Sequence, residues 1–447
     1  MGAGESGTGA ALLAKAKGFD VFVSDNGTIA EKYRLDLEGN NIPFEEKKHS
    51  EDRILESQII IKSPGIPDTV GIIQKAVEKG IRIIDEIEFA AHYTTARIIA
   101  ITGTNGKTTT TLLTYHLLKE AGWNVGLAGN IGQSLAKQVI EDKYDWYVVE
   151  ISSFQLEGTY TFNPYVGVIL NITPDHMDRY DHKLQNYVNA KFRLVQNLGA
   201  EDHFIYYQDN DVVRQEVDKH TISSHVHSLS LEHGASAYLE DGDMIFDKAA
   251  EDGFRIALKD TVLRGKHNAI NMMAAVQSAL TCGVSEEWIR KGLKTFVNAP
   301  HRLEYVTSIN NVDFVNDSKA TNVDAVGYAL ESFSEPLVWI AGGVDKGNNY
   351  DLIMETVNQK VKALICLGKD NQKLRDAFHE EIIDLLETDN MKDAVKSAMT
   401  YAHEHDVILL SPACASFDLF KSYEDRGEQF KEAVWELKQG FENQVLS

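Results

Sequence analysis

The stretch at residues 97–113, RIIAITGTNGKTTTTLL, constrains the fold more than any other part of the chain. Its first six residues, Arg97–Thr102, form a short apolar run rich in β-branched side chains, which predicts a buried strand. The run ends at Gly103, and a helical pattern follows over residues 108–121 until Gly122 stops it. A strand, a glycine-containing loop and a helix in this order are typical of α/β domains that bind phosphate groups. The sequence therefore predicts a nucleoside triphosphate site.

The loop GTNGKTTT contains the residue types that such a site needs. Gly103 and Gly106 allow the backbone N–H groups to turn inward, and Lys107 places a positive charge near phosphate oxygens. The hydroxyl of Thr108 can bind Mg²⁺. The Walker pattern has a glycine five residues before Gly106, where this chain has Ile101, so the loop is a shortened form. The alternative is a glycine-rich turn with an incidental lysine.

Composition limits the other function classes. With 447 residues and 43% apolar residues, the chain is expected to form two to four globular domains. The net charge of −23 argues against a nucleic-acid partner. The three cysteines are far apart and include no CxxC pair, which favours a reducing, cytoplasmic setting. No apolar run is long enough to cross a membrane and no targeting segment is recognisable, so neither is expected.

The first residues, MGAGESG, have the glycine spacing of a dinucleotide-binding turn. A helical stretch to Lys17 and a predicted strand at 20–24 follow, and Asp25 then stands where an acidic residue can bind a ribose or a base. The first strand of such a fold precedes the glycines, where this sequence has only Met1. We therefore expect an N-terminal Rossmann-like domain without its first strand. A nicotinamide dehydrogenase would also fit this turn, but it leaves GTNGKTT unexplained.

Two further strands are predicted to carry polar residues to the edge where the phosphate loop lies. The strand at 146–151 ends with Glu150, in the position where a nucleotide-binding α/β domain holds Mg²⁺. The strand at 165–170 opens into NITPDHMDRY, where His176 is a candidate metal ligand or substrate contact. The alternatives are a solvated carboxylate and a capped loop histidine.

The rest of the central region is predicted as helices and short strands. The helix at 183–197 contains Lys191, but the spacing of its residues alone does not identify this lysine as functional. The segment at 203–263, with a hairpin at 241–242, is expected to lie outside the main sheet. A helix at 264–282 places two asparagines one turn apart, where they bind a base or ribose or simply decorate the helix.

The last third returns to alternating strands and helices after NAPHR at 298–302, which marks a domain boundary. A polar or glycine-rich loop follows three of its strands, so all three loops are expected at one edge of a third α/β domain. These loops are NDSKATN at 316–322, AGGVDKG at 341–347 and SPACASFDLF at 411–420.

These motifs together resemble the Mur ligases over nearly the entire chain. The resemblance is carried by GTNGKTT, Glu150, NITPDHMDR, Lys191, HNAIN, PHR and NDSKATN. The glycine turn near the start, combined with SPACASFDLF near the end, resembles the branch of the family that adds D-glutamate. The tetrapeptide Asp-Asn-Pro-Arg, which marks the next enzyme of that pathway, is absent.

The resemblance implies an architecture and a reaction. The implied domains are a UDP-substrate-binding Rossmann-like domain at 1–90, a central P-loop ATPase domain at 91–297 and an amino-acid-binding Rossmann-like domain at 298–447. The implied reaction belongs to peptidoglycan precursor synthesis: ATP phosphorylates the carboxylate of UDP-N-acetylmuramoyl-L-alanine, and D-glutamate attacks the acyl phosphate, releasing ADP and phosphate. The implied enzyme is cytoplasmic and monomeric, uses ATP and two Mg²⁺ ions, and has neither a nucleic-acid nor a membrane partner.

The resemblance also implies roles for individual residues. The catalytic set is Lys107, Glu150, His176 and Lys191, and the metal set is Thr108, Glu150, His176 and Lys191 as a carbamate. The ATP set is Gly103, Thr104, Asn105, Gly106, Lys107, Thr108, Thr109, Asn268, Asn271, Arg302, Asp317 and Lys319. The UDP-substrate set is Gly4, Ser6, Asp25, Asn26, Ser63, Gly65, Asn130, Gln155 and His176. The D-glutamate set is Thr321, Lys346, Ser416 and Tyr423.

Two more functions are compatible with the sequence. One is that of a different ATP-dependent acid–amino-acid ligase, such as another Mur ligase or a folylpolyglutamate synthetase, separable by its amino-acid preference. The second is that of a nucleotide-binding switch that makes no bond. The loops around Thr321, Lys346 and Ser416 argue against the switch, since it has no use for them.

Overall fold

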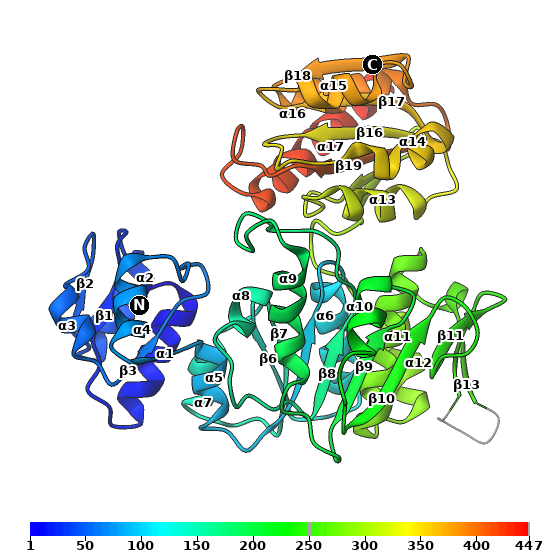
Figure 1. Ribbon diagram of the computed structural model, residues 1–447. Helices are drawn as coiled ribbons and strands as arrows, with labels where there is room; N and C mark the ends of the chain where they lie inside the picture. Colours follow the sequence, from blue (N-terminus) through cyan, green and yellow to red (C-terminus); the bar gives the residue numbers. More distant parts are fainter. Residues whose placement is uncertain (248–252, 264, 446–447) are drawn as a thin grey trace. The chain divides into compact units, whose positions relative to one another are not determined.

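A computed structural model describes residues 1–247, 253–263 and 265–445 of the chain. By their internal contacts these residues form two compact units. The first unit comprises Met1–Val262 and Ala269–Phe296, and the second comprises Leu263–Asn268 and Val297–Ser447. Figure 1 labels most of their helices and strands. Both units are of the predicted α/β class, and each is described by itself.

The N-terminal part of the first unit contains two small parallel sheets, in which β1 pairs with β2 and β3 with β4. Its elements are α1 (Glu5–Ala16), β1 (Val23–Ser24), α2 (Glu31–Gly39), β2 (Phe44–Glu45), α3 (Glu51–Leu55), β3 (Ile59–Ile61), α4 (Gly71–Glu78), β4 (Arg82–Ile84) and α5 (Glu86–Ala91). The strand predicted at 20–24 is shorter than expected, because only its last two residues pair with β2.

The first two residues connect these two sheets. The backbone N–H of Gly2 donates to the carbonyl of Ser24 in β1 at 2.9 Å. The amino group of Met1 donates to the carbonyl of Ile61 in β3 at 2.6 Å, and the N–H of Ser63 donates to the carbonyl of Met1 at 2.9 Å. In the described part of the chain, β1 and β3 belong to separate sheets and do not pair with each other.

The central part of the first unit is built on a nine-stranded sheet of order β13-β12-β11-β10-β9-β8-β5-β7-β6. Its strands are β5 (Arg97–Thr102), β6 (Val125–Gly129), β7 (Trp146–Glu150), β8 (Val166–Ile169), β9 (His203–Tyr207), β10 (His225–Ser230), β11 (Ala237–Glu240), β12 (Asp243–Phe246) and β13 (Phe254–Ala257). In the order of the sheet, all neighbours from β11 through β5 to β6 pair in parallel. The buried apolar runs of these strands are typical of a sheet covered on both faces.

The helices of this part are α6 (Lys107–Glu120), α7 (Leu135–Val139), α8 (Ser153–Leu156), α9 (Leu184–Phe192), α10 (Asp211–Val217), α11 (Lys266–Cys282) and α12 (Glu286–Thr295). Short 3₁₀ turns lie at Arg193–Val195 and Leu258–Asp260.

One expectation about this part was wrong. The segment at 203–263 does not lie outside the main sheet, because β9 pairs with β8 and the sheet then continues to β13. The hairpin predicted at 241–242 is present between β11 and β12, with positive φ at both Asp241 and Gly242.

The second unit contains a six-stranded sheet of order β14-β15-β19-β16-β17-β18. Its elements are β14 (Glu304–Ile309), β15 (Val312–Asn316), α13 (Val323–Glu331), β16 (Leu337–Gly342), a 3₁₀ turn (Tyr350–Ile353), α14 (Met354–Lys360), β17 (Val361–Leu367), α15 (Gln372–Phe378), β18 (Asp384–Thr388), α16 (Met391–Tyr401), β19 (Val407–Ala413) and α17 (Tyr423–Val445). Only β14 runs antiparallel to its neighbour.

Alternation along the strands of this sheet creates two separate cores. In β16, Trp339 packs with α13, α14 and α15, whereas its neighbours Val338 and Ile340 pack with α16 and α17. This alternation is the two-residue repeat of a strand whose two faces are both buried.

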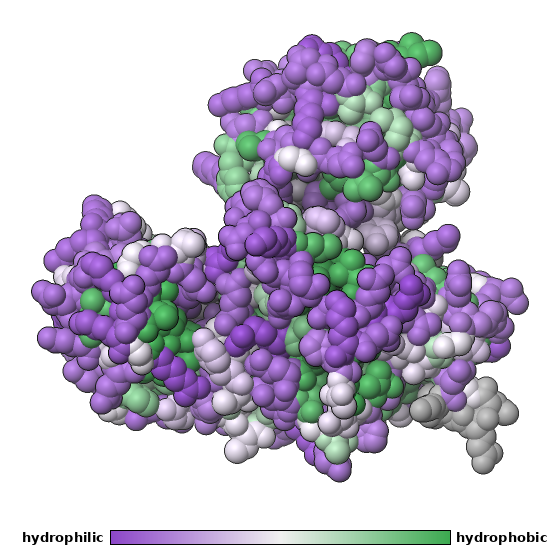
Figure 2. Space-filling model, in the orientation of Figure 1, coloured by the Kyte–Doolittle hydropathy of each residue, from purple (hydrophilic) through white to green (hydrophobic). Residues whose placement is uncertain are grey.

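The visible face of the molecule is mostly hydrophilic (Figure 2). Among the described residues, no helix combines the length and apolar character needed to span a bilayer.

Candidate functional site

The predicted strand, loop and helix around residue 103 are confirmed. Strand β5 ends at Thr102 and helix α6 begins at Lys107. Gly106 precedes the helix with φ of 84°, and a Cβ atom there would lie 2.2 Å from Oδ1 of Asn271. Gly103 has φ of 154°, and its Cβ would lie 3.0 Å from that of Leu170. Glycine at these positions thus lets the loop turn while α11 packs closely against it.

A residue that the sequence did not single out braces this loop. Asn171, two residues after β8, accepts from the N–H of Asn105 at 2.8 Å and donates to its carbonyl at 3.1 Å. The backbone carbonyl of Asn171 also accepts from the N–H of Thr104 at 2.8 Å. These bonds hold the backbone of the phosphate loop in one conformation. The only sequence signal was the position of Asn171 at a strand end.

Two lysines meet at the carbonyl of Gly103. Nζ of Lys107 donates to it at 2.8 Å, and Nζ of Lys191 donates to it at 2.7 Å. Lys191 is 1% exposed, and burial, together with the nearby charge of Lys107, holds its pKa well below the usual range. Asp175 and Glu150 are close enough to oppose this shift. The structure thus brings Lys191 to the phosphate loop in surroundings that disfavour the charged form of its amine.

Glu150 ends β7 next to β5, as predicted, and carries an unsatisfied oxygen. Its Oε1 accepts from Nδ2 of Asn130 at 2.7 Å, while Oε2 is buried and has no hydrogen-bond partner among the described residues. A buried carboxylate oxygen without a partner is costly, and a cation would satisfy it. The described residues contain no group of three His, Cys, Asp or Glu side chains suited to a metal.

His176 lies in the loop after β8 with φ of 54°. Its side chain is about half exposed, and Nε2 is 3.6 Å from Oδ2 of Asp175. Its ring packs edge-on against Phe154 with the centroids 5.0 Å apart. This contact places the histidine against α8, the helix that also contains Gln155.

A cavity of about 690 Å³ opens beside this site. It is lined by Ser6, Asn130 and Gln155 from the predicted UDP-substrate set, and by Glu5, Lys32, Tyr33, Asp36, Pro64, Gly129, Gly132, Gln133 and Lys137. The predicted residues Gly4, Asp25, Asn26, Ser63 and Gly65 are not part of this lining. The carboxylate of Asp25 instead accepts from the backbone N–H groups of Ala3 and Gly27, each at 2.7 Å.

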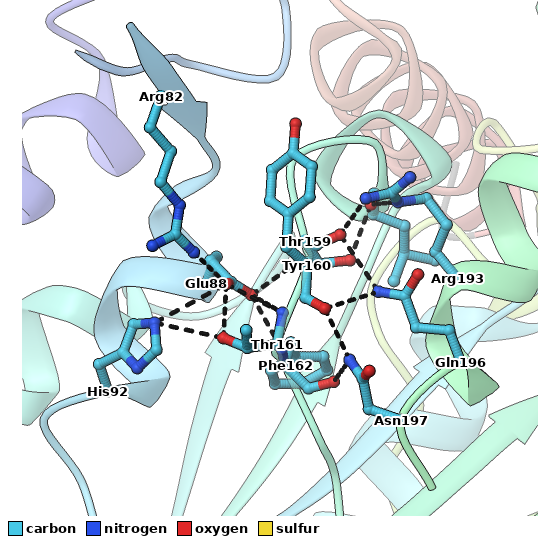
Figure 3. A network of polar contacts seen from close by, with 11 residues as sticks. Arg82, Glu88, His92, Thr159, Tyr160, Thr161, Phe162, Arg193, Gln196 and Asn197 are labelled. Carbon is cyan, nitrogen blue, oxygen red and sulfur yellow. Dashed lines mark hydrogen bonds and ion pairs between the residues drawn. The ribbon is translucent and has the colours of Figure 1, made fainter. Parts of the chain in front are cut away.

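Helix α9, which carries Lys191, is tied to helix α5 through the loop at 159–162 (Figure 3). The side chain of Glu88 is fully buried and accepts from the N–H groups of Tyr160, Thr161 and Phe162 at 2.9 to 3.1 Å. On the other side of the loop, its carbonyls accept from Arg193, Gln196 and Asn197. The loop therefore fixes the C-terminal end of α9.

In the second unit, the three predicted loops do meet at one edge. They follow β15, β19 and β16, which are adjacent and parallel. Asp317 is buried, accepts from the hydroxyl of Ser411 at 3.0 Å, and has a pKa raised to about 7 by burial. Nζ of Lys319 lies 3.5 Å from the ring centroid of Tyr423.

The other predicted residues of this unit lie in the same loops or next to them. Lys346 follows Asp345, whose carboxylate accepts from the N–H groups of Gly347 and Asn348 and so shapes the loop. Ser416 is buried, Thr321 is partly buried, and Arg302 is close enough to Asp317 to influence its pKa. Asn268 also belongs to this unit, whereas Asn271 belongs to the first.

Comparison with known proteins identifies the class. Three domain families match in order: the MurD N-terminal domain at residues 1–70, the Mur ligase middle domain at 101–279 and the Mur ligase glutamate ligase domain at 301–414. The chain belongs to the Mur ligase family.

Two curated relatives are named UDP-N-acetylmuramoylalanine–D-glutamate ligase. The protein of Bacteroides fragilis is 51% identical over 440 residues, which cover 98% of this chain and 99% of the relative. The protein of Christiangramia forsetii is 48% identical over 439 residues, 98% of each chain. Among solved structures, UDP-N-acetylmuramate–alanine ligase from Thermotoga maritima has the same fold, with a TM-score of 0.62, 19% identity and 98% coverage of each chain.

Proposed function

We propose that this chain joins D-glutamate to UDP-N-acetylmuramoyl-L-alanine at the expense of ATP. The main support for the proposal is the position of two lysines and a carboxylate at the phosphate loop. Lys107 and Lys191 both donate to the carbonyl of Gly103, and Glu150 is close enough to influence the pKa of Lys191. The similarity to D-glutamate ligases over 98% of the chain supports the choice of substrates.

The reaction needs a leaving group, because a carboxylate is a poor electrophile. The substrate carboxylate attacks the γ-phosphorus of ATP, forming an acyl phosphate and ADP. The amine of D-glutamate then attacks the acyl carbon, and phosphate leaves with the C–O bond electrons. Lys107 and the N–H groups at the start of α6 are placed to stabilise the charge that spreads over the transferred phosphoryl group.

Mg²⁺ supplies charge neutralisation and orientation of the phosphates when bound. We assign one ion to Thr108 and Glu150, and a second to His176 and a carbamate on Lys191. A neutral lysine amine can add to CO₂, and the resulting carbamate is an anion that can bind a cation. The unsatisfied Oε2 of Glu150 and the lowered pKa of Lys191 both support this assignment.

The cavity beside Asn130 and Gln155 is assigned to the nucleotide sugar. Its volume of about 690 Å³ is within the usual range of small-molecule binding sites. The loops of the second unit are assigned to D-glutamate, through the predicted residues Thr321, Lys346, Ser416 and Tyr423. We retain the domain bounds 1–90, 91–297 and 298–447, a monomeric state, and a cytoplasmic site of action, where ATP and nucleotide sugars are made.

Phosphate release tests this proposal. It should require ATP, Mg²⁺, UDP-N-acetylmuramoyl-L-alanine and D-glutamate together, and L-glutamate, L-alanine or L-lysine should not replace D-glutamate. Turnover with a folate substrate instead would favour a folylpolyglutamate synthetase. Nucleotide binding without phosphate release under any of these conditions would favour a switch.

A further inference from the structure

Arg426 is the most deeply buried cation among the described residues of the second unit. It lies in the first turn of α17 and is 1% exposed. Its guanidinium donates from Nε to the hydroxyl of Ser318 at 3.0 Å and from Nη2 to the carbonyl of Ser318 at 2.9 Å. Nη1 donates to the carbonyls of Cys414 at 3.2 Å and Gly342 at 3.3 Å.

These acceptors lie on three different loops. Ser318 follows β15, Cys414 follows β19 and Gly342 ends β16, and these three strands are neighbours in the sheet. One side chain therefore bonds to every loop at the edge assigned to the amino-acid substrate. The hydroxyl of Ser318 extends the connection, because it donates to the carbonyl of Tyr423 at 2.8 Å.

The contacts of Arg426 serve geometry more than charge pairing. The four hydrogen bonds of Arg426 go to one hydroxyl and three carbonyls. Burial lowers its pKa to about 10, and the nearby charge of Asp418 opposes this shift. The four oxygen atoms that Arg426 binds are buried and would lose a donor without it, so the arginine stabilises the unit as well as joining its loops. Its planar fork suits several fixed acceptors, which the single ammonium group of lysine cannot reach together.

The loops that it joins are held in demanding conformations. Ala413, directly before Cys414, has φ of 62°, which is unfavourable for a residue with a side chain. Gly343 has φ of 123°, and its Cβ would lie 2.2 Å from the carbonyl oxygen of Ala415. Such backbone persists only where surrounding contacts hold it, and Arg426 supplies contacts on both sides.

We propose that Arg426 is a positioning residue that sets the relative placement of the three loops that bind the incoming amino acid. The proposal rests on the proposed function, which assigns Lys346, Ser416 and Thr321 on these loops to D-glutamate. Because the amino acid would contact all three loops, a displacement of one loop relative to the others should weaken its binding and raise its KM.

The test compares Arg426→Lys and Ser318→Ala with the full-length wild-type protein, and uses Arg375→Lys as the matched control. The side chain of Arg375 is 42% exposed and pairs with Glu387 in β18. We measure the KM for D-glutamate, the KM for ATP and the melting temperature of each variant. Arg426→Lys should raise the KM for D-glutamate about tenfold or more while the KM for ATP changes less than about threefold. Ser318→Ala should shift the KM for D-glutamate in the same direction by a smaller factor, and Arg375→Lys should shift neither KM.

Two results would overturn the proposal. One is an unchanged KM for D-glutamate in a folded Arg426→Lys variant, or in Ser318→Ala if Arg426→Lys does not fold. The other is an equal rise of both KM values, since that indicates general loosening of the unit. Lys346→Ala shows whether an unchanged KM for D-glutamate in Arg426→Lys has another cause. If Lys346→Ala also leaves this KM unchanged, the assignment of these loops to D-glutamate in the proposed function fails instead.

Discussion

Burial determines the chemistry available to Lys191. A solvated lysine is protonated near neutral pH, but Lys191 is almost completely buried and lies near a second lysine. Both effects disfavour its charged form, so the pKa falls and the neutral amine becomes accessible. Only the neutral amine adds to CO₂. The position of Lys191 against the phosphate loop, rather than its place in the helix pattern, is what makes it a functional candidate.

Replacing Lys191 by methionine should reduce turnover about a hundredfold or more, because the carbamate oxygens that support a metal are lost. Removing CO₂ from the buffer should slow the wild-type enzyme, and bicarbonate should restore it, whereas the variant should not respond. Lys183→Met is the control, since Lys183 directly precedes the same helix but is exposed. Full activity of Lys191→Met would remove the assigned role.

Gly106 combines a left-handed backbone with a close contact, and a matched glycine separates the two effects. Gly106 and Gly122 have φ of 84° and 83°, but only Gly106 has a neighbour within the reach of a Cβ atom, namely Asn271. Both alanine variants should lose about 1 to 3 kcal/mol of stability through backbone strain. Only Gly106→Ala should also raise the KM for ATP, because Asn271 and the loop must separate. An equal KM for ATP in the two variants would contradict the role given to the contact between Gly106 and Asn271.

At the scale of elements, the loop at 159–162 shows how a short segment connects two helices. Its N–H groups bind Glu88 of α5, and its carbonyls bind side chains that follow α9. Both hydrogen-bonding directions of the backbone are thus used. The placement of Lys191 consequently depends on a carboxylate in a different helix.

Glu88→Gln should loosen this loop, since an amide nitrogen would face backbone N–H donors and lose their hydrogen bonds. Amide hydrogen exchange at Tyr160, Thr161 and Phe162 should accelerate about tenfold or more. Glu78→Gln, an exposed change in α4, should leave these amides unaffected. Unaltered exchange in Glu88→Gln would show that the loop does not depend on the carboxylate.

Glu86 predicts a pH dependence at the contact between α5 and α7. Its Oε1 accepts from the hydroxyl of Ser134 and the N–H of Ala136, while burial raises its pKa to about 7 from an ordinary 4.5. Between these values the folded protein holds a proton that the unfolded chain releases, so stability falls as pH rises. The melting temperature should therefore decline between about pH 5 and about pH 8, and Glu86→Gln should remove the share of the decline that this proton causes. Glu38→Gln, a change at an exposed residue, should leave the decline as it is.

The sequence predicted the elements whose signals are local. The strand Arg97–Thr102 was predicted to the residue, and α6 begins one residue before the predicted start, because apolar periodicity and glycine placement define both. The segment at 203–263 was misplaced because strand pairing with β8 is a long-range property. The hydrogen bonds of Asn171 to the phosphate loop and the burial of Lys191 also depend on long-range packing. For that reason neither was predicted.

At the scale of the whole molecule, the chain carries a net charge of −23 although its proposed substrates are anions. Binding must therefore rely on local cations and N–H groups rather than on the overall field. The phosphate loop has Lys107 and the N–H groups at the start of α6 for this purpose, and the predicted ATP set adds Lys319 from the second unit.

The most direct test of the account follows one oxygen atom. UDP-N-acetylmuramoyl-L-alanine labelled with ¹⁸O in its carboxylate is incubated with ATP, Mg²⁺ and D-glutamate, and the released phosphate is analysed by mass spectrometry. An acyl phosphate intermediate predicts that each released phosphate carries one ¹⁸O atom and that an equal amount of D-glutamyl product forms. Unlabelled phosphate would mean that water, and not the substrate carboxylate, attacks ATP, and it would contradict the assignment of this chain as an acid–amino-acid ligase.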